Sequence, residues 1–324
     1  MDLAKSNALS LAGGALGSLA QATTTPWGSK PTGPEAVMLG LVAVGLCAMI
    51  VWIVRRIVHP GKLDLAPTPN RPNTVSPVHI LILLLVWQGS GGVVRAVLTG
   101  LWPAGSKEQV SIVAAVVQQV IWLGASLAVA AMTFRHGLRR GLGLSARHWV
   151  YDGARGVFAY LAVLPACFGL FLAGQALYKS LYHQPPPVHQ MLTILRSVSW
   201  PWQAMVVISA VVLAPWGEEI FCRGLLQSMF RRYTARPWVA VTLTSAVFAL
   251  LHWNSMASAG GGKGTTTMPA MEIIGAGWIQ LPAMFVLSMV LGYNYERTGR
   301  LYAPILIHTL FNAVSVVLFL AGGT

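Results

Sequence analysis

Residues 214–226 read APWGEEIFCRGLL and place two adjacent glutamates and an arginine between strongly apolar flanks. The whole chain of 324 residues has only 9 acidic side chains, and two of them stand side by side here. An ionisable side chain at bilayer depth costs roughly 2.5–3.5 kcal/mol on insertion scales. If these flanks cross a membrane, the charges between them need a structural or chemical reason.

The composition places the chain among membrane proteins. It is 55% hydrophobic and 10% charged, with a mean hydropathy of +0.63, whereas a soluble domain has about 25% charged residues. A net charge of +13 would suggest nucleic acid in a soluble protein. Here the arginines lie in short loops between apolar runs, so we expect the lipid bilayer and no nucleic acid as a partner.

Apolar runs of spanning length, about 20 residues each, predict the fold. They lie near residues 36–54, 77–98, 110–134, 153–175, 198–218, 238–257, 273–292 and 301–320. The fifth run is expected to continue as a helix past residue 218. The prediction is therefore an all-α, polytopic membrane protein with about eight transmembrane helices around an intramembrane polar cavity.

The distribution of basic residues supports this map. Loops after the even-numbered spans contain only Lys107, Lys179, Arg196 and Lys263. Loops after the odd-numbered spans hold the arginine-rich stretches, such as Arg55, Arg56, Arg139, Arg140, Arg231 and Arg232. By the positive-inside rule the second set faces the cytoplasm, and both termini then face outward.

Helical spacing divides the charges of the opening stretch. Glu219 and Arg223 are four residues apart, so they share a face and can form an ion pair. Glu218 is rotated by about 100° from its neighbour and has no obvious local partner. Pro215 and Gly217 are expected to loosen or kink the helix just before the glutamates.

Two later helices carry polar groups in an apolar context. His252 follows Phe248 by four residues, and His308 precedes Asn312 by four. Singly, each could be a packing residue, since an intramembrane histidine often bonds a backbone carbonyl and an asparagine often joins helices. At about 1.5 Å per residue, Glu218, His252, His308 and Asn312 reach overlapping depths near mid-membrane. One shared polar site explains all four.

Such a set supports two chemistries. In one, Glu218 and His252 hold and deprotonate a water, while His308 and Asn312 stabilise the oxyanion. In the other, Glu218, His252 and His308 bind Zn²⁺ with one open position. The HExxH signature of soluble zinc proteases is absent. Both alternatives predict hydrolysis of an amide bond.

Three motifs on successive late helices carry a resemblance. They are EExxxR (Glu218, Glu219, Arg223), FxxxH (Phe248, His252) and HxxxN (His308, Asn312). In this order and spacing they resemble the CAAX-protease and bacteriocin-processing (CPBP) family of intramembrane proteases, which includes the type II CAAX prenyl endopeptidases. The stretch 138-LRRGLGLSARHW-149 is similar to the segment that precedes the family's core.

The resemblance covers roughly residues 138–320 and predicts a protease core at residues 136–324. Residues 35–135 would be transmembrane helices that the resemblance does not anchor. Residues 1–34 are rich in Ala, Gly, Ser and Thr, and this composition predicts a flexible tail. It implies these roles: Glu218 as the base, His252 as its partner on the water, His308 with Asn312 as the oxyanion site, Arg223 orienting Glu219, and Phe248 as structural support. We favour the reaction without a metal because Asn312 suits an oxyanion better than a cation; zinc is the alternative cofactor.

The expected substrates are membrane-associated peptides or proteins. Prenylated C-terminal peptides, leader peptides and membrane-embedded peptides are the options. A proton-coupled transporter is the main alternative function because intramembrane Glu and His also form proton relays, although no inverted repeat is visible. A non-catalytic membrane scaffold or immunity protein is the other. The location would be the cell membrane in a bacterium or the endoplasmic reticulum in a eukaryote.

Overall fold

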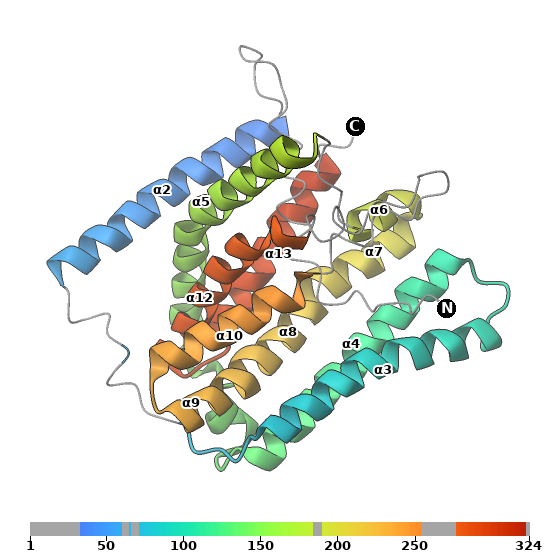
Figure 1. The fold of residues 1–324 in the computed structure, drawn as a ribbon, viewed down its shortest axis with the longest axis horizontal. Coiled ribbons are helices and arrows are strands. Elements are labelled where there is room, and N and C mark those ends of the chain that lie inside the picture. The colour runs from blue at the N-terminus through green and yellow to red at the C-terminus, as the bar shows by residue number, and fades with distance from the viewer. Residues whose placement is uncertain (1–32, 60–64, 66–70, 184–189, 254–276, 322–324) are drawn as a thin grey trace.

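The fold is helical throughout the described part of the chain. The computed structural model describes residues 33–59, 65, 71–183, 190–253 and 277–321 (Figure 1). Among these residues the only strand-like pairing is an isolated antiparallel bridge between Asn73 and Phe134. The all-α prediction is therefore confirmed. Residues 1–32 of the predicted tail lie outside the described residues. So does 258-SAGGGKGTTTMP-269, whose sequence predicts a loop.

Each predicted apolar run coincides with a helix. The helices are α2 (Gly33–Val58), α3 (Pro77–Leu101), α4 (Lys107–Thr133), α5 (Trp149–Tyr182), α6 (Gln190–Ser197), α7 (Trp200–Ile208), α8 (Ala214–Glu219), α9 (Ser228–Thr234), α10 (Pro237–Leu251), α12 (Leu281–Thr298) and α13 (Tyr302–Ala321). Among the described residues, 6 helical stretches are long and apolar enough to cross a membrane, and α10 is a shorter apolar helix. This is the organisation of a multi-pass integral membrane protein.

Several predicted helix ends were wrong, and two of them lie on helices that carry the candidate site and its supports. The sixth run was expected to reach residue 257, but α10 ends at Leu251. The seventh was expected to end near residue 292, but α12 continues to Thr298, where Gly299 caps it with a left-handed φ of +69°. Its last turns are polar yet helical because Glu296 accepts a hydrogen bond from Arg231 at 3.0 Å. An ion pair with a residue of another helix therefore stabilises these last turns, and the local hydropathy of the sequence does not reveal it.

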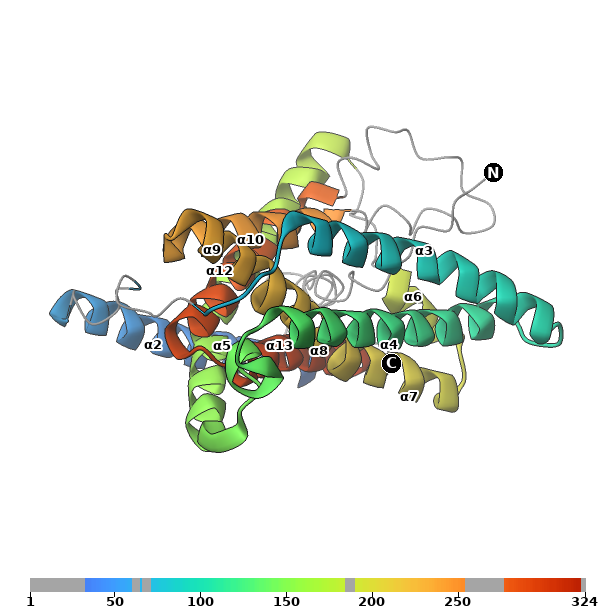
Figure 2. The same cartoon turned by 90° about the horizontal axis from the view of Figure 1, so that it is seen from below.

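The helices of the predicted core are flanked on two sides. Helix α10 packs against α12, and α5 packs against both α12 and α13. Helix α4 of the α3–α4 hairpin packs against α8, while α2 packs mainly on α5. Figures 1 and 2 show α8, α10, α12 and α13 between the hairpin and α2. The helices that carry the predicted site residues therefore lie inside the bundle.

A half-buried ion pair ties the start of α13 to the start of α5. Arg300 donates from Nε to Asp152 Oδ2 at 2.7 Å and from Nη2 to Asp152 Oδ1 at 2.6 Å. These hydrogen bonds raise the pKa of the Arg300 guanidinium above its ordinary value. Such a bidentate pair fixes orientation as well as distance. It sets where α13 begins, and therefore the depth of the polar residues further along that helix.

Helix α2 contacts α5 closely at one glycine. A Cβ on Gly45 would lie 2.5 Å from the Leu161 carbonyl oxygen and 2.9 Å from the Pro165 ring. We expect Gly45→Leu to lower the free energy of unfolding by about 1–3 kcal/mol because it overpacks this crossing. Gly40→Leu is the matched control, since nothing lies within 4 Å of that position. Thermal unfolding in detergent would measure both; equal midpoints for the two variants would contradict the prediction.

Candidate active site

The helix that carries the two glutamates is irregular on both sides of them. π-Helical turns at Ser209–Leu213 and Ile220–Gln227 flank the α-helical segment Ala214–Glu219. Pro215 lacks an N–H and disturbs the hydrogen-bond ladder of the preceding turn. The predicted loosening before the glutamates therefore takes the form of a π-helical turn. Turns of this kind occur frequently at functional sites.

Glu218 lies where three helices meet. Its side chain is 2% exposed, and its Oε2 atom lies 3.8 Å from Nε2 of His252 and 3.8 Å from Nε2 of His308. These distances exceed those of direct hydrogen bonds, and contacts of this length are commonly bridged by a water. The structure thus brings together the carboxylate and both histidines that the sequence grouped by depth.

The other ring nitrogens of the two histidines are already engaged. Nδ1 of His252 lies 2.7 Å from the carbonyl oxygen of Phe248, and Nδ1 of His308 lies 2.9 Å from Glu219 Oε1. Both partners are acceptors, so each Nδ1 is assigned as the donor. In a neutral imidazole, the Nε2 atom then carries the lone pair. Two lone pairs therefore face the Glu218 carboxylate.

Glu219 has two partners rather than one. Its Oε1 atom accepts the predicted hydrogen bond from Arg223 Nη1 at 2.9 Å and also the bond from His308. The Arg223 guanidinium also donates from Nη2 to Ser288 Oγ at 2.7 Å. The Arg223 Cζ atom lies 4.7 Å from the centre of the Phe248 ring. The expected ion pair is confirmed, and it also orients one of the histidines.

Two residues that support the site, Ser288 and Gln280, were not predicted from the sequence. Ser288 lies in an apolar run of α12, and no spacing pattern distinguishes it from a packing residue. Gln280 donates from Nε2 to the His252 carbonyl at 2.6 Å, just before α12 begins. His252 itself forms the C-cap of α10 rather than the middle of a longer helix. A side-chain amide therefore satisfies a carbonyl that the end of α10 leaves open.

Asn312 lies one turn beyond His308 and is 1% exposed. Its Nδ2 atom donates to the carbonyl oxygen of Ala210 at 2.9 Å. Ala210 belongs to the π-helical turn before Pro215, so this bond ties α13 to the glutamate-bearing helix. One amide hydrogen is used in this way. Its role toward an oxyanion stays a prediction.

A small cavity of about 10 Å³ adjoins Glu218 on the side of the α3–α4 hairpin. This is close to the lower limit for a single water. Its walls are Trp87, Gln119, Trp122, Leu213, Ala214, Gly217 and Glu218. A Cβ on Gly217 would lie 3.3 Å from the Trp122 ring. The glycine therefore lets the glutamate-bearing helix approach α4 closely.

The donor atoms suit zinc in kind. One carboxylate and two imidazole nitrogens, each ring held through its other nitrogen, form a familiar ligand set. Two ligands of a tetrahedral zinc ion lie about 3.3 Å apart, compared with 3.8 Å here. Among the described residues, no group of three His, Cys, Asp or Glu side chains is assembled tightly enough to hold a metal as it stands.

A comparison with known protein families points to the same segment. Residues 200–314 match the family described as Type II CAAX prenyl endopeptidase Rce1-like. A curated Escherichia coli protein, described as an uncharacterized 24.3 kDa protein, is 25% identical over 141 residues, which are 43% of this chain and 53% of that protein. The chain thus spans about half of this relative's length. No solved structure matched the chain.

The matched segment contains every residue that the sequence proposed for the site. It begins at the start of α7 and ends within α13, so it includes all three helices that meet at Glu218. The resemblance drawn from the three motifs is therefore confirmed: residues 200–314 form a domain similar to the type II CAAX prenyl endopeptidase Rce1-like family, which is a family of membrane proteases.

Proposed function

We propose that this protein is an intramembrane endopeptidase in which Glu218 activates a water. The observation that carries the proposal is the buried convergence of the Glu218 carboxylate with the Nε2 atoms of His252 and His308, at 3.8 Å each. Three acceptor atoms around one small space favour a molecule that donates hydrogen bonds to them. A water is such a molecule, and a peptidase consumes one.

The proposed reaction uses the groups as they lie. Glu218 takes a proton from the water while the water oxygen attacks the carbonyl carbon of the scissile peptide bond. Asn312 donates its second amide hydrogen to the developing oxyanion. His308 can act as a second donor to the oxyanion only if its Nε2 atom is also protonated. Its Nδ1 atom stays hydrogen-bonded to Glu219 in that state. Glu218 then returns its proton to the leaving amine, so atoms and charges balance.

Zinc remains the alternative for activating this water. Glu218, His252 and His308 would hold the ion, and zinc would supply a bound water of lowered pKa. We expect purified protein to contain much less than one zinc per chain and to keep its peptidase activity in a chelator. Elemental analysis combined with the chelator assay checks this. Stoichiometric zinc and activity lost on chelation would overturn the metal-free mechanism but not the reaction class.

The proposed substrates are peptides that reach the site from the membrane. We propose prenylated C-terminal peptides and leader peptides as the two classes to compare. Protein reconstituted in liposomes should cleave at least one of them, and mass spectrometry of the products would locate the cut. No cleavage of either class, together with substrate accumulation driven by a pH gradient, would favour the proton-coupled transporter instead.

A further inference from the structure

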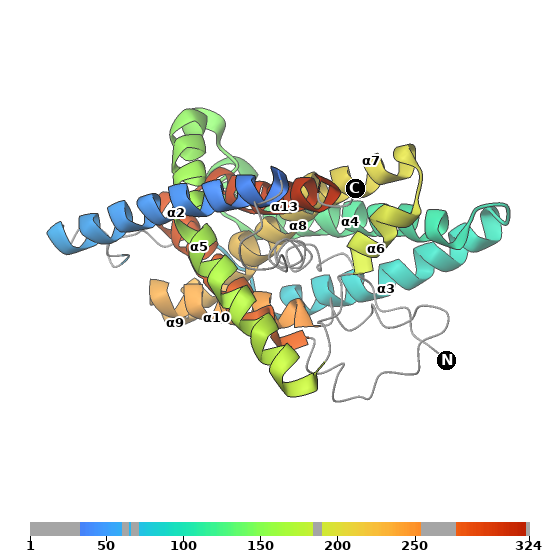
Figure 3. The ribbon, with the colours of Figure 1, turned by 90° about the horizontal axis from the view of Figure 1, so that it is seen from above.

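A large pocket lies away from Glu218, on the outer side of α5 and α12. It measures about 820 Å³ and is lined by the C-terminal half of α2, the first half and middle of α5, one residue of α10 and the stretch of α12 from Val286 to Asn294. This volume falls within the range of small-molecule sites. Helices α2 and α5 meet at Gly45 and Pro165 and cross there (Figure 3), and the pocket opens beyond that contact.

One part of the pocket is apolar and open to lipid. Met49, Phe158, Ala162, Val286 and Met289 line it. Trp52 on its α2 side is 42% exposed. Helix α2 is one of the stretches long and apolar enough to span a membrane, and only 17% of its most apolar window is buried inside the protein. The apolar part is therefore reachable from the hydrocarbon layer.

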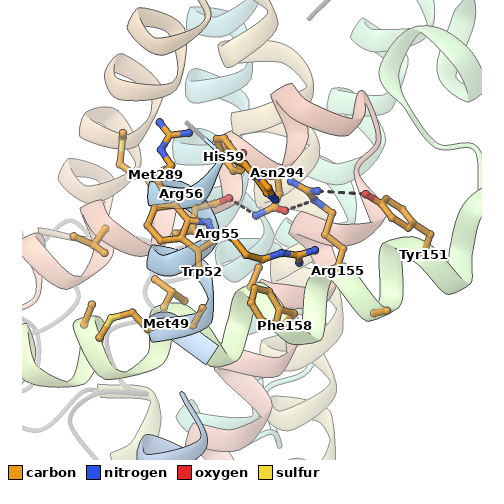
Figure 4. A pocket seen from close by; sticks show the side chains of 18 of the residues that line it. Met49, Trp52, Arg55, Arg56, His59, Tyr151, Arg155, Phe158, Met289 and Asn294 are labelled. Atoms are coloured by element: carbon orange, nitrogen blue, oxygen red, sulfur yellow. Dashed lines mark hydrogen bonds between the residues drawn. The ribbon is translucent and has the colours of Figure 1, made fainter. Parts of the chain in front are cut away.

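The other part of the pocket is strongly basic. Arg55, Arg56, His59 and Arg155 line it, and Figure 4 shows His59 and Arg155 beside Asn294. Arg155 donates from Nε to Asn294 Oδ1 at 2.7 Å and from Nη1 to the Tyr151 hydroxyl at 3.5 Å, so its remaining terminal N–H groups can bind another partner. Within the described ranges, no carboxylate forms an ion pair with these three arginines. Their charge lacks a counter-ion from the described protein.

We infer that this pocket binds one anionic phospholipid, with an acyl chain along the apolar wall and the phosphate at Arg55, Arg56 and Arg155. Two observations on the same cavity point to this occupant: a lipid-facing apolar trough and an uncompensated basic end. The sequence also assigns the C-terminal end of α2 and the start of α5 to the cytoplasmic side, where anionic headgroups attract basic residues. The inference does not depend on the proposed peptidase reaction.

Native mass spectrometry of the full chain in detergent would test the inference. Dioleoyl-phosphatidylglycerol, dioleoyl-phosphatidylcholine and inorganic phosphate are titrated separately. We expect one phosphatidylglycerol to bind more tightly than phosphatidylcholine, and phosphate alone to bind negligibly. Arg55→Gln/Arg56→Gln should weaken phosphatidylglycerol binding roughly 30-fold, at about fivefold for each basic residue. Arg139→Gln/Arg140→Gln, which removes two exposed charges outside the pocket, should bind as the unaltered protein does.

A second pair of variants tests the chain-binding part. Ala162→Phe fills the apolar wall but leaves every arginine in place, so it should also reduce phosphatidylglycerol binding. Ala43→Phe is its control, because Ala43 is exposed on α2 and does not line the pocket. Equal affinity for the two lipids, no effect of either pocket variant, or a farnesylated peptide binding there in place of phosphatidylglycerol would each overturn the inference.

Discussion

Replacing Glu218 by glutamine is expected to reduce peptide cleavage by about 10²–10⁴-fold, the contribution typical of a general base. Glutamine keeps the size and shape of the side chain but cannot accept the proton of the attacking water. Because Glu218 is 2% exposed and faces two histidine lone pairs, the amide can still be accommodated there. The measurement is the initial rate of product formation by purified protein in liposomes.

The control for this variant is Glu108→Gln. Glu108 lies in the first turn of α4 and is exposed, so the change removes the same charge without touching the site. The unfolding midpoint and membrane insertion of both variants should match those of the unaltered protein. Undiminished cleavage by Glu218→Gln would sink the proposed mechanism. A stable but inactive Glu218→Gln with an active Glu108→Gln would support it.

Removing Glu219 is expected to have the largest effect on stability. Glu219 and Arg223 are both 0% exposed and lie 2.9 Å apart. Removing one partner of a buried pair leaves an uncompensated charge, which costs about 3–5 kcal/mol. Glu219→Ala should therefore lower the free energy of unfolding by that amount. Reversible unfolding in detergent measures it.

The double variant separates the charge effect from the packing effect. Replacing a whole buried pair by apolar groups of similar volume is often nearly neutral. Glu219→Leu/Arg223→Met should therefore recover much of the stability that Glu219→Ala loses. It should not recover activity, because His308 also loses the acceptor of its Nδ1 proton. A double variant less stable than the single one would show that the ion pair does not account for the loss.

The sequence allowed the convergence of the site to be predicted because its cause is local. Spacing along a helix sets which side chains share a face, and buried charge in an apolar run demands a partner. These two rules paired Glu219 with Arg223 and left Glu218 to face the histidines, and the structure agrees. The sequence predicted only that the helix would loosen or kink near Pro215. The proline shows where the backbone hydrogen bonds of the helix are interrupted, but it does not show that a π-helical turn forms there.

The contacts that depend on tertiary packing were not predictable. Nothing near Ser288 or Gln280 in the chain distinguishes them from other polar residues in apolar surroundings. The helical last turns of α12 depend on Arg231, which is far away in sequence. The shared use of Glu219 by Arg223 and His308 also requires knowing how α13 lies against α8. In each case the partner comes from another helix.

The π-helical turns around the glutamates make this segment sensitive to length as well as to chemistry. A π turn accommodates more residues than an α turn, and π-bulges in α-helices act as a single inserted residue. Deleting one residue between 220 and 227 would let this stretch relax toward α geometry, and the helix beyond the deletion would keep its phase. The side chains within the stretch, Arg223 among them, would then face different neighbours. Deleting one residue from a regular α-helix would instead rotate everything beyond the deletion by about 100°.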